Sequence, residues 1–262
     1  MEILIDHEVH GYNGFKSNFT RDTFQEEASV YTWDAFEIIF HYPSEHLVNE
    51  QRMDIEWQVY HFANSDELAI NLGQEVTSEE DQASTSSGHR RLAEDGGHED
   101  HFEFLPVERP IIFDFAVVSL LFDSENYDRN ISQEEIDFLD SFFESLDLDN
   151  DNVYLDLVEI GKLMELMDFS RRWAYRGSVS YPPCHRLVYW NVIEKVYPIK
   201  AKHVDQFRAK LERWGLDFST SIGNVREVQR RFNKDVYFIM SGAVRLGGVW
   251  AVLAGGVLAV WA

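Results

Sequence analysis

Four runs of aromatic and β-branched residues constrain the fold of this chain more than any other feature. They are SVYTWDAFEIIFHY, MDIEWQVYHFA, IIFDFAVVSLLF and LVYWNVIEKVYPI. Residues of these types favour strands, and a short segment with the turn-like stretch Val48-Asn49-Glu50 lies between the first two runs, as expected for antiparallel neighbours. The runs therefore predict a mainly β protein built on a large sheet.

Helical signals are fewer and shorter. Ser132-Gln-Glu-Glu, at the start of SQEEIDFLDSFFESL, resembles the N-terminus of a helix. Two further segments, LVEIGKLMELM and AKHVDQFRAKLERWG, carry apolar residues at spacings of three and four. These segments predict a few short helices in addition to the sheet, in an α+β arrangement.

The balance of charge narrows the classes of partner. The 262 residues carry a net charge of -23, so the surface repels the phosphates of nucleic acids, and we expect no nucleic-acid partner. The chain has one cysteine, Cys184, so neither a disulfide framework nor a cysteine-based zinc site forms within it.

A polar insert interrupts the sheet-forming runs. Residues 71–103 are rich in serine, glycine and acidic residues and show no apolar period. This composition predicts a solvated loop inside a domain that spans residues 1–235.

The C-terminal segment has a different character. Residues 246–262 are apolar without exception, and residues 236–244 extend this character beyond the single charge of Arg245. We expect residues 236–262 to form one transmembrane helix that anchors the domain to an organelle membrane, such as the mitochondrial inner membrane, or to the cell surface. Small residues allow close approach of a second helix, as in a membrane complex. Those expected to do so are Gly247, Gly248, Gly255 and Gly256.

Three separated stretches resemble one family, the α-carbonic anhydrases. FEIIFHYPSEHLVNEQRMDIEWQVYH resembles the metal-binding strand hairpin of that family. YRGSVSYPPC, with VYWNVIEKVYPIKAKHVDQFR after it, resembles its Gly-Ser-Leu-Thr-Thr-Pro-Pro-Cys segment and the strand and helix next in the chain. NVREVQ resembles its closing Asn-x-Arg-x-x-Gln. The resemblance covers roughly Tyr12 to Phe232.

This resemblance implies a large, twisted, mainly antiparallel sheet with short peripheral helices and a metal site at the bottom of a cone-shaped cleft. Roughly the first fifth of the family domain has no counterpart here, so it implies an N-terminally truncated domain. Either the sequence is incomplete at that end, or a partner covers the surface that the missing part leaves exposed.

The resemblance also locates the positions of the metal ligands. In active members three histidines bind zinc, and the corresponding residues here are Ile39, His41 and Gln58. Three neutral imidazoles bring zinc-bound water to a pKa of about 7, and the resulting hydroxide attacks carbon dioxide. Isoleucine has no lone pair, and a glutamine amide oxygen is a poor zinc ligand. The resemblance therefore implies a lost zinc site and no bound cofactor.

Other parts of the family's apparatus have counterparts in the chain. Glu45 and Ser180 stand where the family orients the zinc-bound hydroxide, and Glu37 and Glu56 stand where carboxylates hold the ligand histidines. In regular strands Glu37, His41 and Glu56 share one face, so a replacement metal site built from these three residues is an alternative.

The carbon dioxide pocket is expected to be filled by side chains. Tyr60 and Tyr181 replace small residues of the family and are expected to occupy the space that a missing metal and its water would leave. The residues expected to line this pocket are Tyr60, Val117, Val179, Tyr181 and Trp190.

These features predict a pseudoenzyme rather than an enzyme. Our main hypothesis is a catalytically inactive, membrane-anchored binding or scaffold module, and a narrower form of it is an accessory subunit of a membrane protein complex. The alternative is an active carbonate dehydratase that uses an atypical metal site.

Overall fold

The computed structural model describes residues 2–19, 29–64, 113–150, 158–229, 235–240, 242–246 and 249–253. The polar insert predicted for residues 71–103 lies outside these described residues. The chain divides into a larger unit and a smaller one, which comprises Lys16–Thr32 and Asn64–Ile112. All residues of the candidate site belong to the larger unit, which comprises Met1–Phe15, Trp33–Ala63 and Phe113–Ala262.

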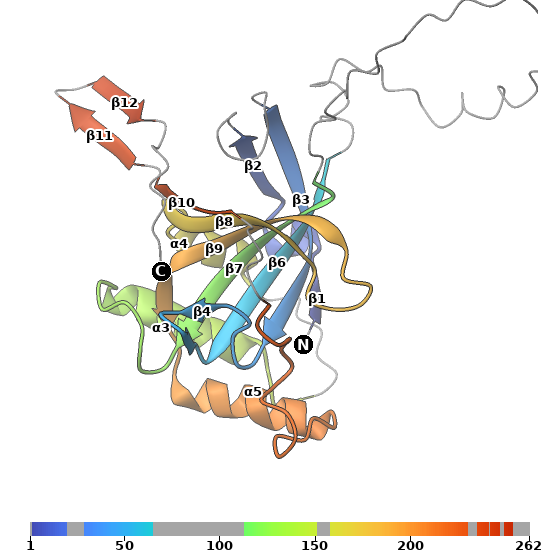
Figure 1. Ribbon diagram of the computed structural model, residues 1–262. Helices are drawn as coiled ribbons and strands as arrows, with labels where there is room; N and C mark the ends of the chain where they lie inside the picture. Colours follow the sequence, from blue (N-terminus) through green and yellow to red (C-terminus); the bar gives the residue numbers. More distant parts are fainter. Residues whose placement is uncertain are drawn as a thin grey trace, which may run out of the picture. The chain divides into compact units, whose positions relative to one another are not determined.

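A large mixed sheet forms the framework of the fold (Figure 1). Its strands follow the order β1-β3-β6-β7-β9-β8-β10, and β2 pairs with β3 beside this path. Neighbours along the path are antiparallel except β7 and β9, which are parallel. The strands are β1 (Glu2–Leu4), β2 (Gly14–Phe19), β3 (Ser29–His41), β6 (Ile55–Ala63), β7 (Phe115–Asp123), β8 (Arg171–Ser178), β9 (Arg186–Pro198) and β10 (Val236–Met240).

The four sequence runs that predicted strands correspond to β3, β6, β7 and β9. A small hairpin of β4 (Leu47–Val48) and β5 (Gln51–Arg52) connects β3 to β6. Asn49 and Glu50 form its turn with φ of 50° and 65°, a left-handed backbone typical of two-residue hairpin turns. The turn predicted at Val48-Asn49-Glu50 is confirmed.

Short helices accompany the sheet, as predicted. They are α1 (His7–His10), α3 (Gln133–Ser145), α4 (Ile160–Leu166) and α5 (Ala201–Arg213). Ser132 caps α3 and forms a reciprocal capping box with Glu135, which satisfies two backbone donors at the helix start.

Alternation along the strands separates two faces of the sheet. Trp57 of β6 points to the apolar face, where its ring stacks 5.4 Å from Phe40 of β3 and 5.2 Å from Phe142 of α3, so this face is covered by helices. Gln58 and Tyr60 point to the opposite face, because successive side chains of a strand alternate. We call this second surface the site face.

The C-terminal segment differs from the prediction. Over the described part of residues 236–262, the chain forms strands rather than a helix: β10, β11 (Gly242–Leu246) and β12 (Val249–Leu253). Among the described residues, no helix has the length and apolar character that crossing a membrane requires. The four glycines expected at a helix contact lie outside the described residues.

β10 forms a strand because it pairs with β8, which lies far away in the sequence. Val236, Tyr237, Phe238 and Ile239 are all strand-favouring residues, and β10 pairs antiparallel with β8, with Val236 opposite Tyr175. A count of apolar residues within the segment does not reveal that β8 offers a free edge.

Candidate functional site

The strand register gathers the expected ligand positions on the site face. Ile39 of β3 lies opposite Gln58 of β6, and His41 lies opposite Glu56. Gln58 in turn lies opposite Ser119 of β7. Ile39, His41 and Gln58 therefore share one face of the sheet.

Gln58 is fully buried, and its amide is committed to protein partners. Its Nε2 donates to Glu45 Oε2 at 3.0 Å and to Glu56 Oε1 at 2.8 Å. Its Oε1 accepts a hydrogen bond from the Tyr60 hydroxyl at 2.9 Å. The side chain thus bridges two carboxylates on one side and a phenol on the other.

Glu56 lies at the centre of this polar network and is also fully buried. Its carboxylate accepts hydrogen bonds from the backbone N–H of His46 at 2.8 Å, from His46 Nδ1 at 2.7 Å and from the Ser119 hydroxyl at 2.8 Å. The other ring nitrogen of His46, Nε2, lies 2.7 Å from the Tyr175 hydroxyl. A buried carboxylate with this many donors is well satisfied.

The pKa shifts describe Glu56 and His46 as an ion pair. Burial would raise the pKa of Glu56, but the charge and hydrogen bond of His46 hold it well below its ordinary value. Burial would lower the pKa of His46, but the charge and hydrogen bond of Glu56 raise it above 6.5. Burial raises the pKa of Tyr175, so its phenol stays neutral.

His41 has a different environment. It is buried, with 6% exposure, and its Nδ1–H donates to the backbone carbonyl of Asn224 at 2.9 Å. In a neutral ring with Nδ1 as the donor, Nε2 carries the lone pair, and this atom has no hydrogen-bond partner in the described part of the chain. Glu45 Oε1 lies 3.8 Å from Nδ1.

The segment around Asn224 is fixed against the end of β3. The Asn224 side chain accepts from Tyr42 N at 2.8 Å and donates to Phe40 O at 2.8 Å. Gly223 has a φ of 155°, and a Cβ there would lie 1.8 Å from Tyr42 O, so only glycine permits this approach. Two residues after Asn224, the backbone N–H of Arg226 donates to Glu45 Oε1 at 3.0 Å.

The expected pocket residues form a packed cluster on the site face. Tyr60, Val117, Val179 and Trp190 belong to one buried apolar cluster together with Val188. Tyr60 is 1% exposed, and burial raises its pKa.

Tyr181 and Ser180 come after β8, at the edge of this cluster. The Tyr181 ring lies 6.1 Å from that of Tyr60, but it is 41% exposed, so Tyr60 provides most of the filling. The hydroxyl oxygen of Ser180 is buried.

The residues present do not fit a three-histidine zinc site. Ile39 offers no donor atom, and both polar atoms of the Gln58 amide are occupied by Glu45, Glu56 and Tyr60. Of the three positions, only His41 retains a nitrogen lone pair. A single imidazole supplies one of the three ligands that a catalytic zinc requires.

The alternative metal site finds no support in the side-chain geometry. Glu37 is buried, but it does not join His41 and Glu56 in a group of close donor atoms. Within the described ranges, such a group of three is found only at Asp140, Glu144 and His203. There Lys202 pairs with both carboxylates, and Lys200 and His203 pair with Asp140.

Sequence reasoning did not identify several residues of this network. His46, Ser119 and Tyr175 come from a loop, β7 and β8, and they meet only through long-range pairing. The available signal was His46 itself, which stands directly after Glu45 and two residues before the predicted turn at Val48-Asn49-Glu50.

Comparisons with known proteins agree with the sequence motifs. Residues 113–240 match the family model described as eukaryotic-type carbonic anhydrase. No curated protein sequence matches the chain significantly.

Three solved structures illustrate the structural similarity. A carbonic anhydrase from Chlamydomonas reinhardtii is 17% identical, with 90% of this chain and 76% of that chain covered and a TM-score of 0.47. The α-carbonic anhydrase of Thermovibrio ammonificans is 16% identical, with 86% and 76% covered and a TM-score of 0.47. Dioscorin, complexed with ascorbate, is 20% identical, with 87% and 76% covered and a TM-score of 0.47.

Proposed function

We propose that the chain, whose residues 113–240 match the model of the eukaryotic-type carbonic anhydrases, is a catalytically inactive binding or scaffold module of that family. The observation that carries the proposal is the state of Gln58. Its amide stands where the third zinc ligand is expected, and it ties Glu45, Glu56 and Tyr60 together. The amide is therefore fully used in hydrogen bonds within the protein.

Exposed aromatic side chains beside the site support a role in binding. Phe36 and Phe62 stack at 3.9 Å, and Phe115 lies 5.3 Å from Phe62. Phe62 is 48% exposed and Tyr181 is 41% exposed. Exposed apolar groups that lie together are typical of surfaces that bind a partner, and a protein partner is the one we propose.

Membrane attachment through residues 236–262, and membership of a membrane complex, stay predictions. Fractionation tests them: a chain truncated after Asp235 is expected to leave the membrane fraction, whereas the full chain resists alkaline carbonate. Retention of the truncated chain would place the attachment elsewhere.

One observation favours the alternative, an active carbonate dehydratase. His41 keeps a buried Nε2 without a hydrogen-bond partner among the described residues, and this is the atom with which a neutral imidazole binds a metal. Two further ligands would then have to come from outside the described residues or from solvent.

Zinc analysis and a carbon dioxide hydration assay on the purified chain distinguish the inactive module from the active carbonate dehydratase. We expect a zinc-to-protein ratio near zero and hydration at the uncatalysed rate. The exposed His185 supplies a matched control. Stoichiometric zinc with activity that His41→Ala removes and His185→Ala leaves intact would establish the dehydratase.

A further inference from the structure

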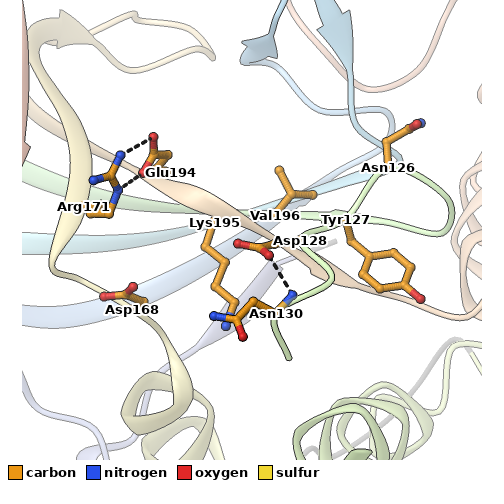
Figure 2. Close-up of a pocket in the computed structure, with 9 residues that line it drawn as sticks. All are labelled: Asn126, Tyr127, Asp128, Asn130, Asp168, Arg171, Glu194, Lys195 and Val196. Carbon is orange, nitrogen blue, oxygen red and sulfur yellow. Dashed lines mark hydrogen bonds and ion pairs between the residues drawn. The ribbon is translucent and has the colours of Figure 1, made fainter. Parts of the chain in front are cut away.

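A pocket of about 330 Å³ lies between the loop after β7, the start of β8 and the end of β9, and it is separate from the polar network around Glu56 (Figure 2). Its polar walls come from three places: the loop after β7, the start of β8 with the turn before it, and the end of β9. They are Asp128 and Asn130, Asp168 and Arg171, and Glu194 and Lys195. None of these residues takes part in the hydrogen bonds around Glu56.

The loop wall is held in place by hydrogen bonds. Asp123, the last residue of β7, accepts from the backbone N–H of Glu125 at 2.9 Å and of Asn126 at 2.6 Å. Asp128 N donates to Val196 O of β9 at 2.9 Å, and Asp128 Oδ1 accepts from Asn130 N at 2.8 Å. The wall is therefore formed before any ligand arrives, which reduces the entropic cost of binding.

Two of the charged residues in the pocket, Arg171 and Glu194, neutralise each other. The Arg171 guanidinium binds both carboxylate oxygens of Glu194, with Nη2 to Oε1 at 3.0 Å, and lies 5.1 Å over the Phe238 ring. Figure 2 shows this pair at one side of the pocket. A bidentate pair of this kind leaves little charge for a ligand to neutralise.

The remaining groups keep hydrogen-bonding capacity. The Lys195 ammonium lies 5.0 Å over the Tyr197 ring, and within the described part of the chain it has no carboxylate within 4.0 Å. Asp168 accepts from Ser170 N at 3.0 Å. Hydrogen bonds from the side chain and the backbone of Ser170 lower the pKa of Asp168, and the Lys195 charge lowers it further. Asn130 adds an exposed amide that both donates and accepts.

This set of groups selects a class of ligand. Val196 and the Tyr127 ring are the apolar parts of the lining, and Arg129 lies 4.0 Å over that ring, so an apolar molecule gains little. A strongly charged molecule meets charges of both signs. Hydroxyl groups, which donate and accept at once, match a wall where ammonium and amide donors alternate with carboxylate acceptors.

We propose that this pocket binds a neutral polyhydroxylated molecule of the size of a monosaccharide. Lys195 and Asn130 donate to its hydroxyl oxygens, and Asp128 and Asp168 accept from its hydroxyl hydrogens. The site is independent of the proposed loss of catalysis, because the two regions share no side chain.

Saturation-transfer difference NMR on the purified full chain tests the proposal. Glucose, mannose, galactose and N-acetylglucosamine serve as probes, with glycine as a zwitterion and citrate as an anion. We expect saturation transfer to at least one sugar and none to glycine or citrate. Lys195→Met and Asn130→Ala should each weaken sugar binding about fivefold to tenfold, the loss expected for one hydrogen bond.

Lys162→Met is the matched control, because Lys162 is an exposed lysine on α4 that pairs with Glu159 outside the pocket. It should bind the sugar like the parent chain. If Lys195→Met does not fold, Asn130→Ala decides, since its side chain is exposed. No transfer to any sugar, transfer to glycine or citrate instead, or unchanged binding by the pocket variants would overturn the proposal.

Discussion

Two histidines five positions apart on the site face show how one residue type serves two purposes. Both ring nitrogens of His46 have protein partners, Glu56 and Tyr175. His41 has one, the Asn224 carbonyl, and its Nε2 is buried without a hydrogen bond among the described residues. The ring of His46 is therefore fully hydrogen-bonded within the protein, whereas the ring of His41 is hydrogen-bonded at one nitrogen only among the described residues.

This difference predicts unequal consequences for stability. A buried ion pair that loses one member leaves the other charged and unpaired, and the cost exceeds the value of the intact pair. A buried acceptor that already lacks a partner destabilises the parent protein, so its removal costs little. Changes at the ion pair should therefore have the largest effects, and changes at His41 the smallest.

Glu56→Gln should lower the free energy of unfolding by about 3 kcal/mol or more, because His46 then loses the buried carboxylate that stabilises its imidazolium. Urea denaturation at pH 6 measures this change. Glu165→Gln, at an exposed glutamate of α4, is the matched control and should change stability by less than about 0.5 kcal/mol. A loss below about 1 kcal/mol for Glu56→Gln would show that His46 is neutral in the folded protein.

Ile39→His combined with Gln58→His should raise zinc affinity at least about a hundredfold, equivalent to about 2.8 kcal/mol. The register supports this result, because residues 39 and 58 are direct partners and His41 shares their face. A histidine at position 58 also lies beside Glu56, where Gln58 Nε2 donates now. Competition with a fluorescent chelator measures the affinity.

The single variants Ile39→His and Gln58→His are the controls, and each should gain much less than the pair. Hydration activity should return less fully than zinc binding, since the buried Tyr60 still fills the pocket. A double variant that folds but binds zinc no better than the parent would contradict the shared geometry of the three positions.

The ion pair should make the free energy of unfolding depend on pH, with a change of the order of 1 kcal/mol. The folded-state pKa of His46 is raised above 6.5, so its contribution is complete below pH 6.5 and is lost as the pH rises through the folded value. The pKa of Glu56 is lowered from 4.5, so its contribution is present above pH 4.5 and is lost in stronger acid. The pair therefore stabilises most between about pH 4.5 and 6.5.

Urea denaturation at several pH values from 5 to 9 measures this dependence. The parent should lose stability toward pH 9, and His46→Gln should show a flatter profile over the same range. Identical slopes for the two proteins would mean that His46 does not titrate in the folded state above its unfolded pKa.

The parts of the fold that the sequence predicted correctly depend on residues that are close together in the chain. Alternating aromatic and β-branched residues identify β3 and β6, and Ser132 with Glu135 identifies the start of α3. The predicted C-terminal helix is not confirmed over the described residues, where β10 pairs with β8, some sixty residues earlier, and β11 pairs with β12. Composition alone does not distinguish a membrane helix from an edge strand with the same apolar content.

The candidate site likewise contains residues that the sequence predicted and contacts that it did not. The resemblance located Ile39, His41, Glu56 and Gln58, and the structure places them on one face. It did not reveal that His46 reaches back from the loop to Glu56, because that contact depends on how the chain turns after β3.

His41→Phe should have the smallest effect, a change in the free energy of unfolding within about 1 kcal/mol. The variant loses the hydrogen bond to Asn224, but it also removes a buried Nε2 that has no partner among the described residues, and the two terms oppose each other. The matched variant is His46→Phe, which removes both bonds of a satisfied ring and leaves Glu56 charged in the interior. Its loss should exceed that of His41→Phe by about 2 kcal/mol or more. Equal losses in the two variants, measured by urea denaturation under identical conditions, would mean that Nε2 of His41 has a partner in solution, and a bound metal ion would then be the first to test.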